Sequence, residues 1–140
     1  MERSKKAQKY SKFEWVEAPD IKKRVLRLTE DLHLDYLLGE RLFFYRSTGS
    51  KARAYARTWG LPKLWQQALE VEPAYIIEVI SKYFDKLSPR EQDKVFLHEI
   101  SHIPRNFSGA LVPHTHKRKG SFKDKLDDLV ARYLEDNREI

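Results

Sequence analysis

The stretch that decides the fold is Ser88–Pro104, which reads SPREQDKVFLHEISHIP. Its first four residues, Ser88–Glu91, form a capping box: a serine at the cap, a proline at the first helical position and a glutamate three residues after the cap. Apolar residues then recur along one side, and Pro104 is consistent with an end at His102. The stretch therefore predicts one amphipathic helix that runs to His102.

The end of this helix carries His98-Glu99-Ile100-Ser101-His102, the pattern H-E-x-x-H. Residues four apart share a helix face, so His98 and His102 point the same way and can grip one zinc ion. Glu99 projects beside them, where it can polarise a zinc-bound water. The pattern predicts a zinc-dependent hydrolase with Glu99 as the catalytic base, and it favours a peptidase.

A third zinc ligand has to come from outside the motif, because a catalytic zinc takes three protein ligands and leaves a fourth position open. Four of the five histidines fall between positions 98 and 116. His114 is the preferred ligand, since Pro113 stiffens the backbone before it. His116 is the alternative, either as the third ligand or as a side chain that stabilises the oxyanion. Other candidates for the oxyanion donor are Tyr55, Tyr75 and Arg105.

Hydrophobic periodicity places the other elements along the chain. A helix is expected from Pro19 to about Leu38, closed by Gly39, and a last helix from Phe122 toward the C-terminus. The expected strands are 42–45, 53–59 and 74–80, whereas 61–69 is ambiguous, with Trp65 as a possible anchor to the core. Residues 106–119 are expected to form a loop. This order predicts an α+β domain, with a small sheet packed on helices.

The strand expected at 74–80 comes directly before the motif helix, which gives it two possible roles. As an edge strand, it would bind a peptide substrate by main-chain hydrogen bonds along Tyr75, Ile76, Ile77 and Glu78. As a buried core strand, it would have no contact with substrate. The sequence does not decide between the two.

Length and composition limit the organisation and the compartment. The 140 residues suit one domain, with 1–12 as a basic flexible tail and 13–140 as the folded part. The absence of cysteine excludes disulfides and Cys-type zinc sites. No apolar run is long enough to span a membrane and no secretory signal is visible, so a cytoplasmic protein without a membrane partner is expected.

The chain carries a net charge of +6, and much of the excess lies in the first twelve residues and in Lys117-Arg118-Lys119. Basic segments of this kind attract nucleic acid, although many are only solvated ends. Contact with nucleic acid through these two segments is therefore a hypothesis beside that of a peptide or protein substrate. The oligomeric state is open.

The region from about residue 40 to 125 resembles two families of zinc peptidases. The order of strand, capped helix and H-E-x-x-H resembles the SprT-like peptidases. A closer resemblance is to the phage-type metallopeptidases. It is carried by these segments: Ala54–Arg57, Trp59–Pro62, Phe96–Pro104, Phe107–Leu111 and Pro113-His114.

The resemblance implies a minimal zincin-like domain, in which a small, mostly antiparallel sheet packs on an N-terminal helix, the motif helix and a C-terminal helix. It also implies one zinc, with His98 and His102 as ligands, Glu99 as base and His114 as the third ligand. Ser108 stands where metzincins have their third histidine, which excludes that class. Thr115 stands where SprT-like peptidases have a glycine. Peptide deformylases need a cysteine ligand, which this chain lacks.

The sequence thus predicts a small zinc metallopeptidase that hydrolyses peptide bonds with zinc-activated water. The alternative is a nucleic-acid-associated, SprT-like protease, or a regulatory binding module with a structural or vestigial metal site. A zinc hydrolase acting on RNA phosphodiesters fits the motif less well.

Overall fold

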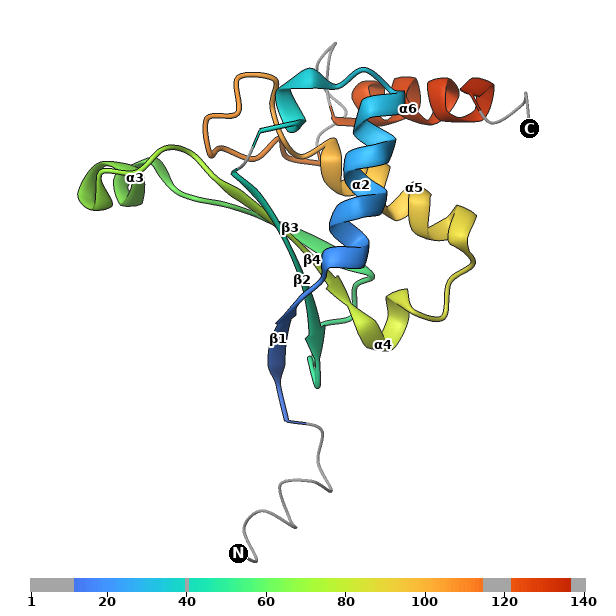
Figure 1. Cartoon of the computed structure of the whole chain (residues 1–140), viewed down its shortest axis with the longest axis horizontal. Helices are drawn as coiled ribbons and strands as arrows, with labels where there is room; N and C mark the ends of the chain where they lie inside the picture. The colour runs from blue at the N-terminus through green and yellow to red at the C-terminus, as the bar shows by residue number, and fades with distance from the viewer. Residues whose placement is uncertain (1–11, 40, 115–121, 137–140) are drawn as a thin grey trace, which may run out of the picture.

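Four strands form one sheet in the order β1-β2-β4-β3, in a computed structural model that describes residues 12–39, 41–114 and 122–136. The strands are β1 (Glu14–Glu17), β2 (Leu42–Thr48), β3 (Ala56–Gly60) and β4 (Tyr75–Ile80). The helices are α2 (Pro19–Asp31), α3 (Lys63–Leu69), α4 (Ser81–Phe84), α5 (Pro89–Ile100) and α6 (Phe122–Asp136), with a 3₁₀ turn, η1 (Asp35–Leu37). Figure 1 shows this arrangement.

The sheet is mixed. β1 and β2 are antiparallel, as are β3 and β4, whereas the central pair β2 and β4 is parallel. The predicted α+β class and the mostly antiparallel sheet are therefore confirmed. Within the described residues, no helix has the length and apolar character needed to cross a membrane.

β4 occupies the interior of the sheet, between β2 and β3. The hypothesis that Tyr75, Ile76, Ile77 and Glu78 form a substrate-binding edge is therefore wrong, because both edges of β4 are already paired. The apolar run explains the position: Ile77 and Val79 face the helices with no exposed surface, and Ile80 on the other face is also fully buried. The core-strand interpretation is the one that the structure confirms.

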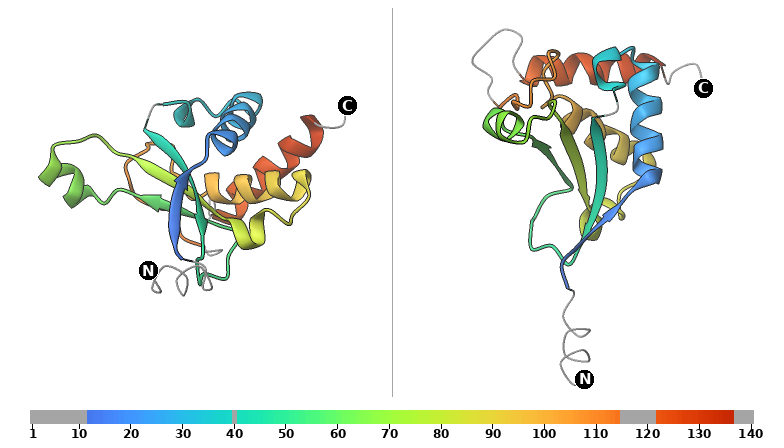
Figure 2. Two further views of the ribbon diagram at one scale, coloured as in Figure 1. Left: turned by 60° about the horizontal axis from the view of Figure 1, so that its bottom comes forward. Right: turned by 60° about the vertical axis from the view of Figure 1, so that its left-hand side comes forward.

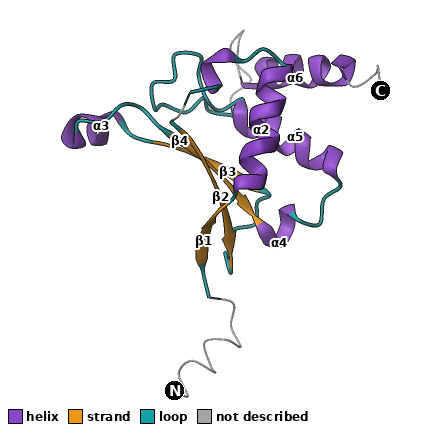
Figure 3. Ribbon diagram, in the orientation of Figure 1, coloured by secondary structure: helices purple, strands orange, loops and turns teal. Residues whose placement is uncertain are grey.

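The three long helices α2, α5 and α6 lie on one side of the sheet, as Figures 2 and 3 show. Their apolar residues join the helix-facing side chains of β2 and β4 in a single core. The opposite face of the sheet carries Trp15, Trp59 and Phe43, which are 58%, 45% and 41% exposed. Among residues 12–39, 41–114 and 122–136, the long helices thus cover one face of the sheet, and the other face is aromatic.

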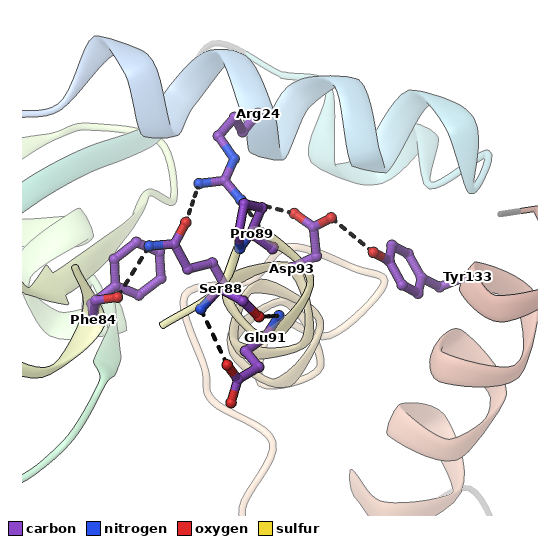
Figure 4. Close-up of polar contacts among 8 residues, drawn as sticks. Arg24, Phe84, Ser88, Pro89, Glu91, Asp93 and Tyr133 are labelled. Carbon is purple, nitrogen blue, oxygen red and sulfur yellow. Dashed lines mark hydrogen bonds and ion pairs between the residues drawn. The ribbon is translucent and has the colours of Figure 1, made fainter. Parts of the chain in front are cut away.

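A polar network ties the three helices together at the start of α5 (Figure 4). The capping box forms as predicted: the Ser88 amide donates to Glu91 Oε1 at 3.1 Å, and the Glu91 amide donates to Ser88 Oγ at 3.2 Å. Asp93 accepts from Arg24 of α2 at 3.1 Å and from Tyr133 of α6 at 2.9 Å. These contacts fix the axis of α5, and so the direction in which its C-terminal end points.

α2 ends earlier than predicted. It begins at Pro19 as expected but stops at Asp31, because His33 adopts a left-handed conformation with φ of 55°. Buried leucines continue past this break at Leu32, Leu34 and Leu37, which is why the apolar pattern extended to Leu38. The expected helix end at Gly39 is wrong, although the burial pattern is right.

The structure differs from the other predictions at four points. β2 runs on to Thr48, β3 begins at Ala56 rather than at residue 53, and β1 was not predicted at all. The ambiguous segment forms α3, which has no buried residue and projects from the body of the domain (Figure 1), so Trp65, 57% exposed, does not anchor it to the core. The last helix begins at Phe122 as predicted. The expected tail lies almost wholly outside the described residues, so the division into 1–12 and 13–140 stays a prediction.

Candidate metal centre

Three histidines converge at the C-terminal end of α5. One ring nitrogen each of His98, His102 and His114 can be chosen so that all three lie within 4.8 Å of one another. The Nε2 atoms of His98 and His114 are 3.0 Å apart. Among the described residues, this is the one group of three or more histidines and acidic side chains close enough to hold a metal ion. Three imidazole nitrogens at these separations are able to hold one metal ion.

The two motif histidines lie on either side of the end of α5: His98 is in its last turn, and His102 follows it. α5 ends at Ile100, and His102 lies in the tight turn that follows, where its amide donates to the Glu99 carbonyl at 3.1 Å. The prediction that the helix runs to His102 is therefore wrong by two residues. The turn still brings the rings of His98 and His102 to a centroid distance of 5.3 Å, so the two side chains lie side by side as the four-residue spacing predicts.

The loop that returns His114 is bonded directly to His102. The imidazole Nδ1 of His102 lies 2.7 Å from the Val112 carbonyl, and the Val112 amide donates to the His102 carbonyl, also at 2.7 Å. Because a carbonyl can only accept, Nδ1 carries the proton and Nε2 is left free to bind a metal. Val112 is two residues before His114. The contact between His102 and Val112 therefore fixes the tautomer of His102 and also holds the loop that brings His114 to the site.

The same loop is fixed to β4 by Tyr75 and to α3 by Gln66. The Tyr75 hydroxyl accepts from the Gly109 amide and donates to the Ala110 carbonyl, both at 2.7 Å. Gln66 Nε2 donates to the Ser108 carbonyl at 2.9 Å. Tyr75 is fully buried and its one proton is used, so its candidacy as an oxyanion donor is wrong. It holds the loop instead.

Two glycines allow the loop and the strand to come this close. A Cβ on Gly60 would lie 2.2 Å from the Gly109 carbonyl oxygen, and a Cβ on Gly109 would lie 2.3 Å from the Leu61 carbonyl oxygen. Gly109 also has a φ of +97°, which side-chain-bearing residues rarely adopt. The loop that leads to His114 therefore packs backbone against backbone on the end of β3.

Phe122 completes the apolar side of the site. This first residue of α6 is 3% exposed and lies against all three imidazoles, with centroid distances of 4.8 Å to His98, 4.5 Å to His102 and 4.6 Å to His114. Such packing restricts the rotation of the rings. No sequence signal singled out Phe122, because its contact depends on how α6 crosses the end of α5.

Two of the histidines are held in the form that binds metals. Burial and the neighbouring His102 and His114 lower the pKa of His98 to about 4. Burial also lowers the pKa of His102, against the opposing effect of its bond to Val112. Both rings are therefore neutral at neutral pH, and a metal does not have to displace a proton from them.

Glu99 is buried beside the histidines, with 5% of its surface exposed. Its Oε1 accepts a hydrogen bond from the Thr58 hydroxyl at 2.9 Å, and its Oε2 lies 3.9 Å from His98 Nε2. Burial raises the pKa of Glu99 to about 7, and the bond from Thr58 only partly opposes this. A carboxyl group that titrates near neutral pH can both accept and release a proton.

β3, not β4, is the sheet edge beside this site. Leu61 donates to the Ala74 carbonyl at 3.0 Å and Ile80 donates to the Tyr55 carbonyl at 2.9 Å, so the odd-numbered residues of β3 face β4. The amide and carbonyl of Thr58 consequently point away from the sheet, along its free edge. Within the part of the chain that the structure describes, this edge of β3 has no strand partner, and it meets the carboxylate of Glu99 at Thr58.

The remaining candidates are outside the described residues or away from the histidine cluster. His116 and Lys117-Arg118-Lys119 fall within 115–121, which the structure does not describe. Tyr55 is half exposed and pairs with Ile80, at the opposite end of β3 from Gly60. His33, the one histidine outside residues 98–116, borders a separate hollow with Asp31 and Arg132. Nothing in the described contacts brings Tyr55 or Arg105 to the histidines.

Comparison with known proteins agrees with this geometry. The family model described as "Putative phage metallopeptidase" matches residues 13–128, a span that includes the sheet, the motif helix and all three clustered histidines. No curated protein and no solved structure matches the chain. Since the family model covers most of the sequence, the chain belongs to the phage metallopeptidase family.

Proposed function

We propose that this chain is a zinc-dependent peptidase in which His98, His102 and His114 hold one Zn²⁺ and Glu99 is the general base. The observation that carries the proposal is the convergence of three imidazoles, within 4.8 Å, next to a buried carboxylate. Neutral imidazoles suit zinc, and the absence of cysteine leaves nitrogen and oxygen donors only.

Zinc, when bound, supplies a Lewis acid that polarises the substrate carbonyl and makes water more acidic. Glu99 takes a proton from the attacking water at Oε2, the carboxylate oxygen nearer His98. It then delivers this proton to the leaving amine. His102 keeps its orientation through Val112, so that Nε2 stays directed at the metal position.

The free edge of β3 is our proposed binding surface for the peptide. An extended peptide adds to a sheet by main-chain hydrogen bonds, and the outward amide and carbonyl of Thr58 offer such bonds directly beside Glu99. This role replaces the one that the sequence suggested for β4. Pairing through the main chain also predicts tolerance of many side chains in the substrate.

Metal analysis tests the metal part of the proposal. We expect about one zinc per chain after purification with zinc present, and its loss in His98→Ala, His102→Ala and His114→Ala. His33→Ala is the matched control, since His33 lies outside the cluster, and it should keep the metal. Zinc that remains bound in all three variants would refute the assignment.

Peptidase activity tests the catalytic part. Hydrolysis of casein or of a quenched fluorescent peptide library should require zinc and be lost on chelation.

Contact with nucleic acid and a cytoplasmic location stay predictions from the sequence alone, because the basic segments that motivate the first lie outside the described residues.

A further inference from the structure

Thr58 is the one residue that joins the free sheet edge to the buried carboxylate. The Thr58 hydroxyl donates to Glu99 Oε1 at 2.9 Å. It also lies 3.1 Å from the main-chain carbonyl oxygen of Glu99. Among the described residues, no other side chain or amide donates a hydrogen bond to the Glu99 carboxylate. The orientation of this carboxylate therefore depends on a single donor from β3.

The bond makes the two carboxylate oxygens different. A carboxylate on a helix end can rotate about its last torsion, which is broad and weakly restricted. Holding Oε1 against β3 leaves Oε2 on the side of His98, at 3.9 Å from its Nε2. A base that must meet a water at a fixed place works well only when its free oxygen is already aimed there.

The main chain of the same residue is available to a peptide. Thr58 pairs with Ile77 at a position of the ladder where its own amide and carbonyl point outward. A peptide added to this edge would thus be aligned by the residue whose side chain orients Glu99. The same strand, β3, would therefore align the peptide and orient the Glu99 carboxylate.

We propose that Thr58 is a positioning residue, which acts through Glu99 to hold Oε2 at the metal position while its main chain sets the register of the substrate. This inference rests on the proposed function and goes beyond it, because it assigns a role to a residue outside the H-E-x-x-H motif. It does not require Thr58 to touch the reacting atoms with its side chain.

Thr58→Val removes the hydroxyl and keeps the shape and the outward main chain. Since hydrogen bonds to charged groups are among the stronger ones, we expect kcat to fall roughly 10- to 100-fold. KM should change less than about twofold, because the main-chain contacts with the peptide survive. Thr58→Ser should recover most of kcat. A Thr58→Val enzyme with the kcat of the wild type would overturn the proposal.

A double-mutant cycle separates positioning from a general loss of structure. If Thr58 acts through Glu99, Thr58→Val should lower the residual activity of Glu99→Gln far less than it lowers wild-type activity. An equal loss in both backgrounds would refute the proposal. Thr29→Val is the matched control, since the Thr29 hydroxyl is also bonded to a carbonyl but lies in α2. It should leave kcat unchanged.

Zinc content and thermal unfolding should accompany each variant. Thr58→Val should keep one zinc per chain, because the three histidines are intact. If it fails to fold, Thr58→Ala and Thr58→Ser provide the same comparison of kcat per bound zinc. Full activity in Glu99→Gln would contradict the proposed function itself. A normal Thr58→Val with an inactive Glu99→Gln would contradict only the role of Thr58.

Discussion

Two carboxylates are buried on opposite faces of the same sheet, and they differ in almost everything except their burial. Glu78 of β4 is fully buried under the aromatic face, and Glu99 is 5% exposed on the helix side. Glu78 accepts hydrogen bonds from Arg57 at 3.2 and 3.3 Å and from Trp59 at 2.8 Å. Among the described residues, the side-chain carboxylate of Glu99 accepts one hydrogen bond, from Thr58.

The number of donors decides the ionisation of each group. Burial alone would raise the pKa of Glu78, but the nearby Ser47 hydroxyl and the hydrogen bonds from Arg57 and Trp59 together outweigh it and lower the pKa. Burial raises the pKa of Glu99 to about 7 because one neutral hydroxyl cannot compensate. Residues 57–59 of β3 donate hydrogen bonds to both carboxylates, so alternating side chains of one strand favour the ionised form of Glu78 and leave Glu99 with a pKa near neutral.

Exchanging the two acids for amides should give the largest difference. Glu99→Gln should lower kcat by roughly 10²- to 10⁴-fold, the range typical of a lost general base, with zinc retained. Glu78→Gln, normalised to folded protein, should keep kcat within about threefold, because Glu78 faces away from the metal site. Equal losses in both variants would show that the contrast between the two carboxylates has no bearing on catalysis.

Removal of the Glu78 side chain should act on stability instead. Glu78→Ala leaves the Trp59 indole without its acceptor and Arg57 without its ion pair. We expect the free energy of unfolding to fall by about 1–3 kcal/mol, a moderate value because Arg57 is partly exposed and can turn to water. Urea unfolding of wild type and variant measures this directly, and a loss below about 0.5 kcal/mol would mean that the network is marginal.

Titration should show the two carboxylates acting with opposite signs. The folded pKa of Glu78 is below its unfolded value, so its stabilisation is complete above about pH 4.3 and is lost as the pH falls through the folded pKa. The gap in stability between wild type and Glu78→Gln should therefore shrink in acid. A gap that stays constant from pH 7 to pH 3 would contradict the lowered pKa.

With metal removed, Glu99 should behave in the reverse way. Its folded pKa of about 7 is above the unfolded value, so the folded state binds the proton more tightly and stability falls as the pH rises toward 7. With chelator present, the free energy of unfolding of Glu99→Gln should therefore rise relative to that of the wild type between pH 5 and pH 8. The same unfolding series measures both effects.

Trp59→Phe should give the smallest effect. It removes only the indole N–H that donates to Glu78 at 2.8 Å and keeps an aromatic ring beside Arg57. We expect a loss of about 1 kcal/mol in the free energy of unfolding, with kcat unchanged. Trp65→Phe on the exposed helix α3 is the control and should be neutral.

Local chemistry explains what the sequence could predict. The capping box, the spacing of His98 and His102 and the position of His114 shortly after them are all contained in one short segment, residues 88–114. Their geometry is set by helix pitch and by one short loop. The family resemblance came from the same region, and the family model confirms the phage metallopeptidase family over residues 13–128.

Strand order and helix crossing explain what the sequence could not predict. Whether β4 lies at an edge depends on β2 and β3, which pair with it from distant positions, and a run of apolar residues looks similar in both cases. The contact of Phe122 with the three imidazoles and the bond from Thr58 to Glu99 join elements that are separated along the chain. Neither leaves a periodic signature.

The close approach of Gly60 and Gly109 also restricts how this protein can change over time. A side chain at Gly60 would clash with the main chain of Gly109, and a side chain at Gly109 would clash with the main chain of Leu61. Because both clashes are with main-chain atoms, a replacement at either glycine cannot be rescued by a smaller side chain elsewhere. Sequence changes in this loop are therefore expected at positions other than these two glycines. We expect the length of chain from Gly109 to His114 to stay constant among active descendants, with insertions accepted only outside it.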